Sequence, residues 1–345
     1  MDKKTKIICT LGTTTDDEDV LEQMVDSGMT GIRLNTAYAT IEDYNKRIIM
    51  TKNIEENLSV MLDIKGPQVR LGNFDAFAIS KGSELLIGFP DENDKSKNTV
   101  YFSKNFHADL KKGDYVLIEN GTIVTEVIDK YSSDVRLKVI EPGEGVIHKY
   151  MGVNIPGVYL NVPKLSEKDK DVISWGLEQK VEQIALSFAR AVEDLKNCYD
   201  YMKQVNPLRA AKTEIVLKIE DRFGFENLDA MLQYSKENRI KTSVMVARGD
   251  LYVEIGAEKL PYVQDQIIKT SQKYGVPVMV GTGVLELMQH SKKPTRAEVC
   301  DVYNILNSGV NYFMLSGETS FGDNPQLVVK TLSKVVNQYY EINLS

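Results

Sequence analysis

The chain has 345 residues, of which 42% are apolar and 26% charged, a composition typical of a soluble globular protein and not of a disordered chain. Its net charge of −7 offers no basic excess for nucleic acid, and no apolar run approaches the roughly 18 residues of a membrane span, so neither partner is expected. The three cysteines are far apart and form no CxxC motif, which excludes a disulfide framework and a thiolate zinc site and favours a cytoplasmic location.

Eight short apolar runs alternate along the chain with amphipathic stretches. Runs that are almost continuous in apolar character are typical of strands buried on both faces of a parallel sheet. Strands are expected at 6–12, 31–35, 59–64, 183–188, 214–220, 243–249, 277–282 and 312–317. Helices are expected at 17–27, 41–55, 166–179, 191–204, 223–235, 257–274, 296–307 and 325–342. Eight strand–helix alternations predict an α/β fold of the (β/α)8, or TIM-barrel, class.

The third strand is followed by a segment that differs in pattern, from about residue 72 to residue 154. It reads as successive β-hairpins, and Asn120 and Gly121 between two apolar runs are a strong signal for a tight turn. We therefore predict a small inserted β-barrel domain at 72–154 and a catalytic barrel domain formed by 1–71 and 155–345. Because an insertion after a barrel strand lies over the active-site face of this fold, the inserted domain is expected to act as a lid.

Charged and polar side chains gather at the expected carboxyl ends of the barrel strands, where this fold carries its chemistry. Arginines, lysines and carboxylates at one mouth indicate an anionic substrate together with a divalent metal. The residues at these strand ends are Arg33, Asn35, Asp63, Lys65, Arg70, Lys218, Glu220, Arg248, Gly249, Asp250, Thr282, Ser316 and Glu318.

Lys218 and Glu220 are the most informative pair in this set. Residues two apart on a strand share a face, so both side chains are expected to point into the barrel mouth. The lysine can neutralise charge on a phosphoryl group in transfer. Glu220 and Asp250, from neighbouring strands, can hold Mg²⁺, which usually takes one or two carboxylates. The alternative is that Lys218 and Glu220 form an ordinary surface ion pair with no role in the chemistry.

Each of the other candidates has a structural alternative as well. The amides that follow Gly249 can bind a carboxylate at a helix start, or belong to a plain turn. Thr282 can donate its hydroxyl to the same carboxylate, or cap a helix. Arg33 and Arg70 can grip phosphate oxygens in fork geometry, or form structural ion pairs.

Nine segments, in this order, resemble those of the pyruvate kinase family, and the resemblance runs from Lys4 to about Val335. The segments are TKIICTLG at 5–12, RLN at 33–35, LDIKGP at 62–67 with Arg70, GVNIPG at 152–157, SEKD at 166–169, KIE at 218–220, MVARGDL at 245–251, KPTRAE at 293–298 and MLSGET at 314–319. The family's barrel with an inserted β-lid is also the architecture that the periodicity predicts independently.

The resemblance implies phosphoryl transfer from phosphoenolpyruvate to ADP, giving pyruvate and ATP. It implies that Lys218 stabilises the transferring phosphoryl group and the enolate, and that Arg33 and Arg70 contact the phosphoryl group as catalytic residues. The amides of Gly249 and Asp250 would receive the substrate carboxylate, and Thr282 would lie beside the methylene carbon that is protonated.

The resemblance also implies metal ligands. Glu220 and Asp250 match the family's ligands for Mg²⁺ or Mn²⁺. Asn35, Asp63 and the carbonyl of Ile64 match its ligands for K⁺. Two departures leave K⁺ dependence open. Ala37 removes a hydroxyl ligand, and Gln68 stands where K⁺-dependent members have glutamate and K⁺-independent members have lysine.

The residues at positions that contact the nucleotide in this family differ more from the family's pattern. Arg33 and Arg70 match residues that contact the nucleotide phosphates. Tyr38 replaces a nucleotide-side histidine, Asn120 a lid aspartate and Met151 a lid lysine. Because ADP is strongly anionic, the loss of these groups predicts weak ADP binding beside normal binding of phosphoenolpyruvate.

Three functions therefore stay open: an active kinase, a sensor that binds phosphoenolpyruvate or pyruvate with metal, and a lyase or decarboxylase that uses enolate chemistry on a 2-oxo acid without a nucleotide. Lys218 favours an enzyme over a sensor. The family usually continues into a carboxyl-terminal domain with sugar-phosphate control, which this sequence does not include. We accordingly expect no such control, and a homodimer through the barrel helices.

Overall fold

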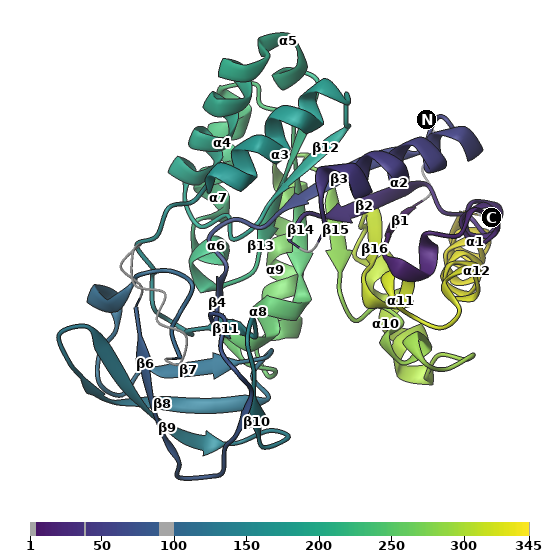
Figure 1. Ribbon diagram of the computed structural model, residues 1–345. Helices are drawn as coiled ribbons and strands as arrows, with labels where there is room; N and C mark the ends of the chain where they lie inside the picture. Colours follow the sequence, from purple (N-terminus) through teal and green to yellow (C-terminus); the bar gives the residue numbers. More distant parts are fainter. Residues whose placement is uncertain (1–4, 38, 90–99, 345) are drawn as a thin grey trace.

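The computed structural model describes residues 5–37, 39–89 and 100–344 of the chain (Figure 1). Eight parallel strands close into a barrel, each strand pairing with the next in the sequence and the last with the first. They are β1 (Lys6–Thr10), β2 (Gly31–Asn35), β3 (Ser59–Ile64), β12 (Gln183–Leu186), β13 (Glu214–Ile219), β14 (Thr242–Ala247), β15 (Val278–Gly281) and β16 (Tyr312–Leu315). The predicted (β/α)8 class is confirmed.

Helices surround the barrel where the amphipathic pattern predicts them. They are α1 (Glu18–Asp26), α2 (Ile41–Ile54), α3 (Glu167–Glu178), α4 (Val192–Val205), α7 (Leu228–Glu237), α9 (Leu260–Lys273), α10 (Arg296–Asn307) and α12 (Pro325–Leu344). None of the described helices is long and apolar enough to cross a membrane.

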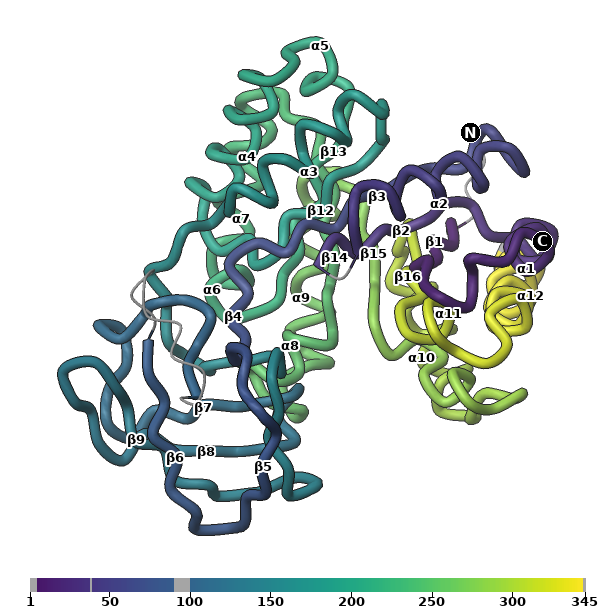
Figure 2. The backbone as a smooth tube through the Cα atoms, in the orientation of Figure 1, coloured from purple at the N-terminus to yellow at the C-terminus, as the bar shows by residue number. Residues whose placement is uncertain are grey.

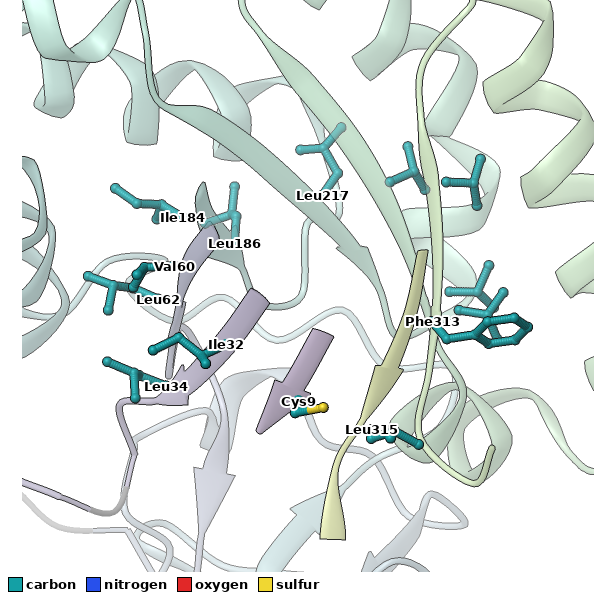
Figure 3. Packing of buried hydrophobic residues seen from close by; sticks show 14 of the residues in the cluster. Cys9, Ile32, Leu34, Val60, Leu62, Ile184, Leu186, Leu217, Phe313 and Leu315 are labelled. Carbon is teal, nitrogen blue, oxygen red and sulfur yellow. The ribbon is translucent and has the colours of Figure 1, made fainter. Parts of the chain in front are cut away.

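Side chains alternate along the barrel strands and divide the apolar core into two parts. Outward-facing residues such as Leu62 and Leu186 pack between the strands and the helices (Figure 3). Inward-facing residues, among them Met61, Met245 and Met314, fill the interior of the barrel. The barrel is thus a packed core, and polar chemistry is left to the strand ends.

Short helices occupy several connections that the periodicity leaves as loops. β14 ends at Ala247, and α8 (Arg248–Ile255) begins at the next residue, so the segment expected to finish a strand and turn is instead the first turn of a helix. The other short helices in such connections are α5 (Pro207–Ala210), α11 (Gly317–Ser320) and the 3-10 turns Thr13–Thr15, His107–Asp109 and Glu286–Gln289. The helix expected at 223–235 is divided at Asn227 into α6 (Arg222–Glu226) and α7.

The segment between β3 and α3 contributes a second, antiparallel sheet. Its strands, in spatial order, are β4 (Val69–Arg70), β11 (Gly152–Asn154), β7 (Tyr115–Ile118), β8 (Ile123–Lys130), β9 (Asp134–Glu141) and β6 (Glu84–Gly88), and β5 (Phe77–Ala78) pairs with β10 (Val146–Ile147). The turn predicted at Asn120 and Gly121 joins β7 to β8. Figure 2 shows this body beside the barrel. We call it the lid.

Candidate active site

A cavity of about 670 Å³ lies at the carboxyl ends of the barrel strands and reaches the lid. The site residues that the resemblance implies and that the structure describes all line it: Arg33, Asn35, Asp63, Ile64, Arg70, Lys218, Glu220, Gly249, Asp250 and Thr282. They come from β2, β3, β4, β13, α8 and the end of β15. Lys65, Arg248 and Ser316 of the wider strand-end set line it as well. Glu318, the last of that set, is buried away from the cavity lining and accepts from the N–H groups of Ser316 and Leu285. Tyr38, the remaining candidate, lies outside the described residues.

Asp63 is the centre of a buried charge network. Its Oδ2 accepts a hydrogen bond from Arg33 Nε at 2.7 Å and forms an ion pair with Arg33 Nη2, also at 2.7 Å. Its Oδ1 accepts from Lys218 Nζ at 3.0 Å and from Ser187 Oγ at 3.1 Å. Burial alone would raise the pKa of Asp63, but the charges of Lys218 and Arg33 outweigh it and lower the pKa. Asp63 is therefore an ionised carboxylate that holds two cations at the mouth of the barrel.

Lys218 keeps its charge although it is buried. Its ammonium also contacts Glu220 Oε1 at 3.0 Å and Ser187 Oγ at 2.8 Å. Burial opposes the charged form, but the carboxylates of Asp63 and Glu220 outweigh burial, and the pKa of Lys218 is raised. The side chain thus presents a fixed positive charge to the cavity, which can stabilise negative charge that develops there.

Glu220 lies between this network and Asp250. Its Oε2 accepts from the backbone N–H of Phe188 at 2.6 Å. Burial raises the pKa of Glu220 to about 7; Lys218 opposes the rise, and the charge of Asp250 adds to it. Glu220 is buried and Asp250 is half-buried, and their charges repel each other. Together they form a hard-oxygen donor set that suits Mg²⁺, which needs only one or two protein carboxylates. These residues fit the divalent cation.

The residues that match the K⁺ ligands are less open than those for the divalent cation. A carboxylate offers about four acceptor positions. Those of Asp63 are engaged by the guanidinium of Arg33, the ammonium of Lys218 and the hydroxyl of Ser187. Asn35 Oδ1 accepts from the N–H of Ala37 at 3.2 Å and keeps its second acceptor position. The carboxylate of this donor set is thus engaged, and its amide oxygen is only half engaged.

The first turn of α8 meets the end of β15 very closely. A Cβ atom at Gly249 would lie 3.1 Å from Thr282 Cγ2, so the approach favours glycine. Thr282 itself has a φ of 71°, a left-handed conformation that is strained for a β-branched residue. The amides of Gly249 and Asp250 therefore begin a helix at the cavity wall, next to the Thr282 side chain.

Arg248 differs from the other strand-end cations. Its Nε and Nη2 donate to the carbonyls of Thr282 and Gly283 at 2.9 and 2.7 Å, and its Nη1 donates to Asp301 at 2.7 Å. Although it lines the cavity, its guanidinium joins the end of β15 to α10. We assign it a structural role.

The lid contributes a wall with little positive charge. Gln68, Arg70, Glu119, Asn120 and Gly152 are its lining residues. Met151, which stands where the family supplies a lysine, is 6% exposed and packs in the hydrophobic core of the lid. Its side chain therefore stabilises the lid and does not line the cavity.

The sequence analysis did not identify Ser187 and Asn154 as site residues. Ser187 directly follows β12 and could have been collected as a strand-end residue, because its segment was already expected to be a strand. Asn154, at the end of β11, donates to Asp250 Oδ1 at 3.2 Å. No local pattern indicates that contact, because the two residues are 96 positions apart.

The fold and the cavity define a (β/α)8 barrel protein whose charged mouth, covered on one side by an inserted β-lid, suits a small anion and a divalent cation. The family model for the pyruvate kinase barrel domain matches residues 2–329. The chain belongs to the pyruvate kinase family.

Curated relatives support the assignment. A pyruvate kinase of Bacillus licheniformis is 36% identical over 356 residues, which cover 98% of this chain and 57% of the relative. Pyruvate kinases of Staphylococcus epidermidis and Staphylococcus saprophyticus are each 34% identical over 342 residues, covering 96% of this chain and 56% of the relative. The chain thus spans little more than half the length of these relatives.

Proposed function

We propose that this cavity transfers the phosphoryl group of phosphoenolpyruvate to ADP, giving pyruvate and ATP, with Mg²⁺ or Mn²⁺ held by Glu220 and Asp250. One observation carries the proposal: the buried network of Lys218, Asp63 and Glu220 faces the cavity. Buried ion pairs contribute little net stability compared with apolar packing, so a functional role accounts for the network better than a structural one.

Binding of the first substrate follows from the fixed positive groups. The amides of Gly249 and Asp250 begin α8, where the helix dipole favours a carboxylate. The guanidinium groups of Arg33 and Arg70 lie on the same cavity and suit the phosphoryl oxygens. Together these groups would fix the substrate between the α8 amides and the lid side.

In the transfer step, the bond between the phosphorus and the enol oxygen breaks, and a terminal phosphate oxygen of ADP forms the new bond to phosphorus. The electron pair remains on the enolate oxygen, where the ammonium of Lys218 stabilises it. A divalent cation held by Glu220 and Asp250 would further neutralise phosphoryl and enolate charge. The enolate then takes a proton from the solvent at its methylene carbon, on the side of Thr282, and becomes pyruvate.

A lactate dehydrogenase-coupled assay with Mg²⁺, phosphoenolpyruvate and ADP tests the proposal. Removing one preorganised charge from a transition state typically lowers kcat by about 10²–10³. We expect at least that loss for Lys218→Met and for Asp250→Asn, and none for the control Lys241→Met at an exposed site. Replacing K⁺ by Na⁺ should change the rate little, because the acceptors of Asp63 are occupied.

The outcomes separate the three functions. Pyruvate formed together with ATP supports the kinase. Pyruvate formed without nucleotide would indicate enolate chemistry of another kind. Binding of phosphoenolpyruvate with no turnover in the wild type, measured by calorimetry, would indicate a sensor. Melting curves show whether Lys218→Met, which leaves Asp63 and Glu220 without their shared cation, still folds. Asp250→Asn provides the second test.

A further inference from the structure

Asn154 connects the lid to the helix that carries a proposed metal ligand. It is the last residue of β11, where the chain leaves the lid, and it pairs with Leu117 of β7. Its side-chain amide is buried and donates to two carboxyl groups of α8. One hydrogen bond goes to Asp250 Oδ1 at 3.2 Å and the other to Glu254 Oε1 at 3.1 Å.

The two carboxylates that accept from Asn154 together fix the orientation of its amide group. Asp250 and Glu254 are four residues apart on α8 and therefore share a face of the helix. Burial raises the pKa of Glu254 to about 7, and the hydrogen bond from Asn154 acts against this rise. An amide group has two N–H donors in one plane, so the bond to Glu254 fixes the plane and directs the second N–H at Asp250.

We propose that Asn154 is a positioning residue that orients the carboxylate of Asp250 for the divalent cation, with Glu254 as the acceptor that holds Asn154 in place. The proposal rests on the function proposed above. Partners that orient metal ligands typically change metal affinity by 10- to 100-fold when they are removed. Because Asn154 belongs to the lid sheet, this contact also joins the lid to the metal site.

Mn²⁺ affinity, read from the electron paramagnetic resonance of the free ion without any substrate, tests the proposal. Asn154→Leu has a similar shape but no donor, and we expect its Kd for Mn²⁺ to rise about 10- to 100-fold. Glu254→Leu should give a rise of similar size. Glu254→Gln should bind Mn²⁺ close to the wild type, because its amide oxygen still accepts. The double variant Asn154→Leu/Glu254→Leu should be no weaker than Asn154→Leu alone.

Asn45→Leu is the matched control, because Asn45 makes a side-chain hydrogen bond to Trp175 that is remote from the cavity. Its affinity should not change. If Asn154→Leu folds and binds Mn²⁺ like the wild type while Asp250→Asn loses the ion, the proposal is overturned and the metal site stands. If Asp250→Asn itself binds Mn²⁺ normally, the metal assignment fails. Should Asn154→Leu not fold, equal affinities of Glu254→Leu and Glu254→Gln would overturn the proposal.

Discussion

Buried Lys218 and half-buried Lys104 show how neighbouring charges decide the effect of burial on a pKa. Lys218 faces Asp63 and Glu220, and their charges outweigh burial and raise its pKa. Lys104 of the lid donates instead to the neutral carbonyl of Gly66 at 3.1 Å, and burial lowers its pKa to about 8. One lysine is a permanent cation of the proposed site. The other destabilises the fold whenever it is protonated.

We predict that Lys104→Met raises the free energy of unfolding at pH 7 by about 1–2 kcal/mol. A pKa lowered from 10.5 to about 8 corresponds to roughly 3 kcal/mol, and the lost hydrogen bond to Gly66 offsets about 1 kcal/mol. Because the folded pKa lies below the unfolded value, the destabilisation is complete below pH 8 and disappears as the pH rises to 10.5. Urea unfolding at pH 7 and pH 10 measures the difference.

The exposed Lys111→Met serves as the control and should leave the stability unchanged at both pH values. A gain for Lys104→Met that is equal at pH 7 and pH 10 would show that it arises from better packing. The charge argument would then be wrong.

At the scale of residues, the sequence indicates which side chains face the cavity but not how they pair. Lys218 and Glu220 share a face because side chains alternate along a strand. The contact of Asp63 with both Arg33 and Lys218 depends on the register between strands, which no local pattern contains. For the same reason the engagement of Asp63, a candidate K⁺ ligand, becomes visible only when its hydrogen bonds and ion pairs are known.

At the scale of elements, Asp169 at the start of α3 caps its own helix and also binds the chain near the lid. Ser166 Oγ accepts from the N–H of Asp169 at 3.1 Å, and Asp169 Oδ2 accepts from the N–H of Ser166 at 2.9 Å. The other oxygen of Asp169 accepts from the buried N–H of Gly66, at the connection to the lid. Thr40 and Asp43 form the same reciprocal pair of hydrogen bonds, a capping box, at the start of α2. There the hydrogen bonds of the Asp43 carboxylate go to the N–H and hydroxyl of Thr40.

We predict that Asp169→Ala destabilises the protein by about 1–3 kcal/mol more than Asp43→Ala. Both variants lose a cap, which costs about 1 kcal/mol. Asp169→Ala also leaves the N–H of Gly66 buried without its acceptor, which adds the desolvation penalty of that group. Urea unfolding of the two variants gives the difference. Ser166→Ala and Thr40→Ala should cost about the same as each other, and equal costs for the two aspartate variants would contradict the second role of Asp169.

The sequence predicts the elements well wherever they are long and periodic. All eight barrel strands and the eight principal helices lie where the pattern places them. Burial of a helix or strand face requires apolar residues at a regular spacing, and this spacing can be recognised in the sequence. The sequence pattern fails at α8, because no loop separates the last residue of β14, Ala247, from the first residue of the helix, Arg248. Gly249 reads as a turn signal, and only the approach of Thr282 shows why a glycine is needed inside a helix there.

At the scale of the whole molecule, the lid and the barrel have separate apolar cores, and residues of both bodies line the cavity. The lid cluster extends from Val69 to Val162 and includes Met151. The lid sheet and its turns present one arginine, Arg70, and one carboxylate, Glu119, to the cavity. This wall therefore offers an anionic nucleotide almost no net positive charge, whereas the barrel strand ends offer Lys65, Lys218 and Arg33.

We predict that ADP binds weakly and that Glu119→Lys strengthens its binding about 10- to 100-fold, since a charge-assisted hydrogen bond contributes roughly 1.5–3 kcal/mol. Glu119→Gln should give a smaller gain, because it removes repulsion without adding a cation. Met151→Lys should instead destabilise the lid, because Met151 is buried in its core. Calorimetric titration of ADP with Mg²⁺ measures these affinities, with the exposed Glu141→Lys on β9 as the control for net charge. An equal gain for Glu141→Lys would mean that the overall charge of the lid, and not its cavity wall, governs nucleotide binding.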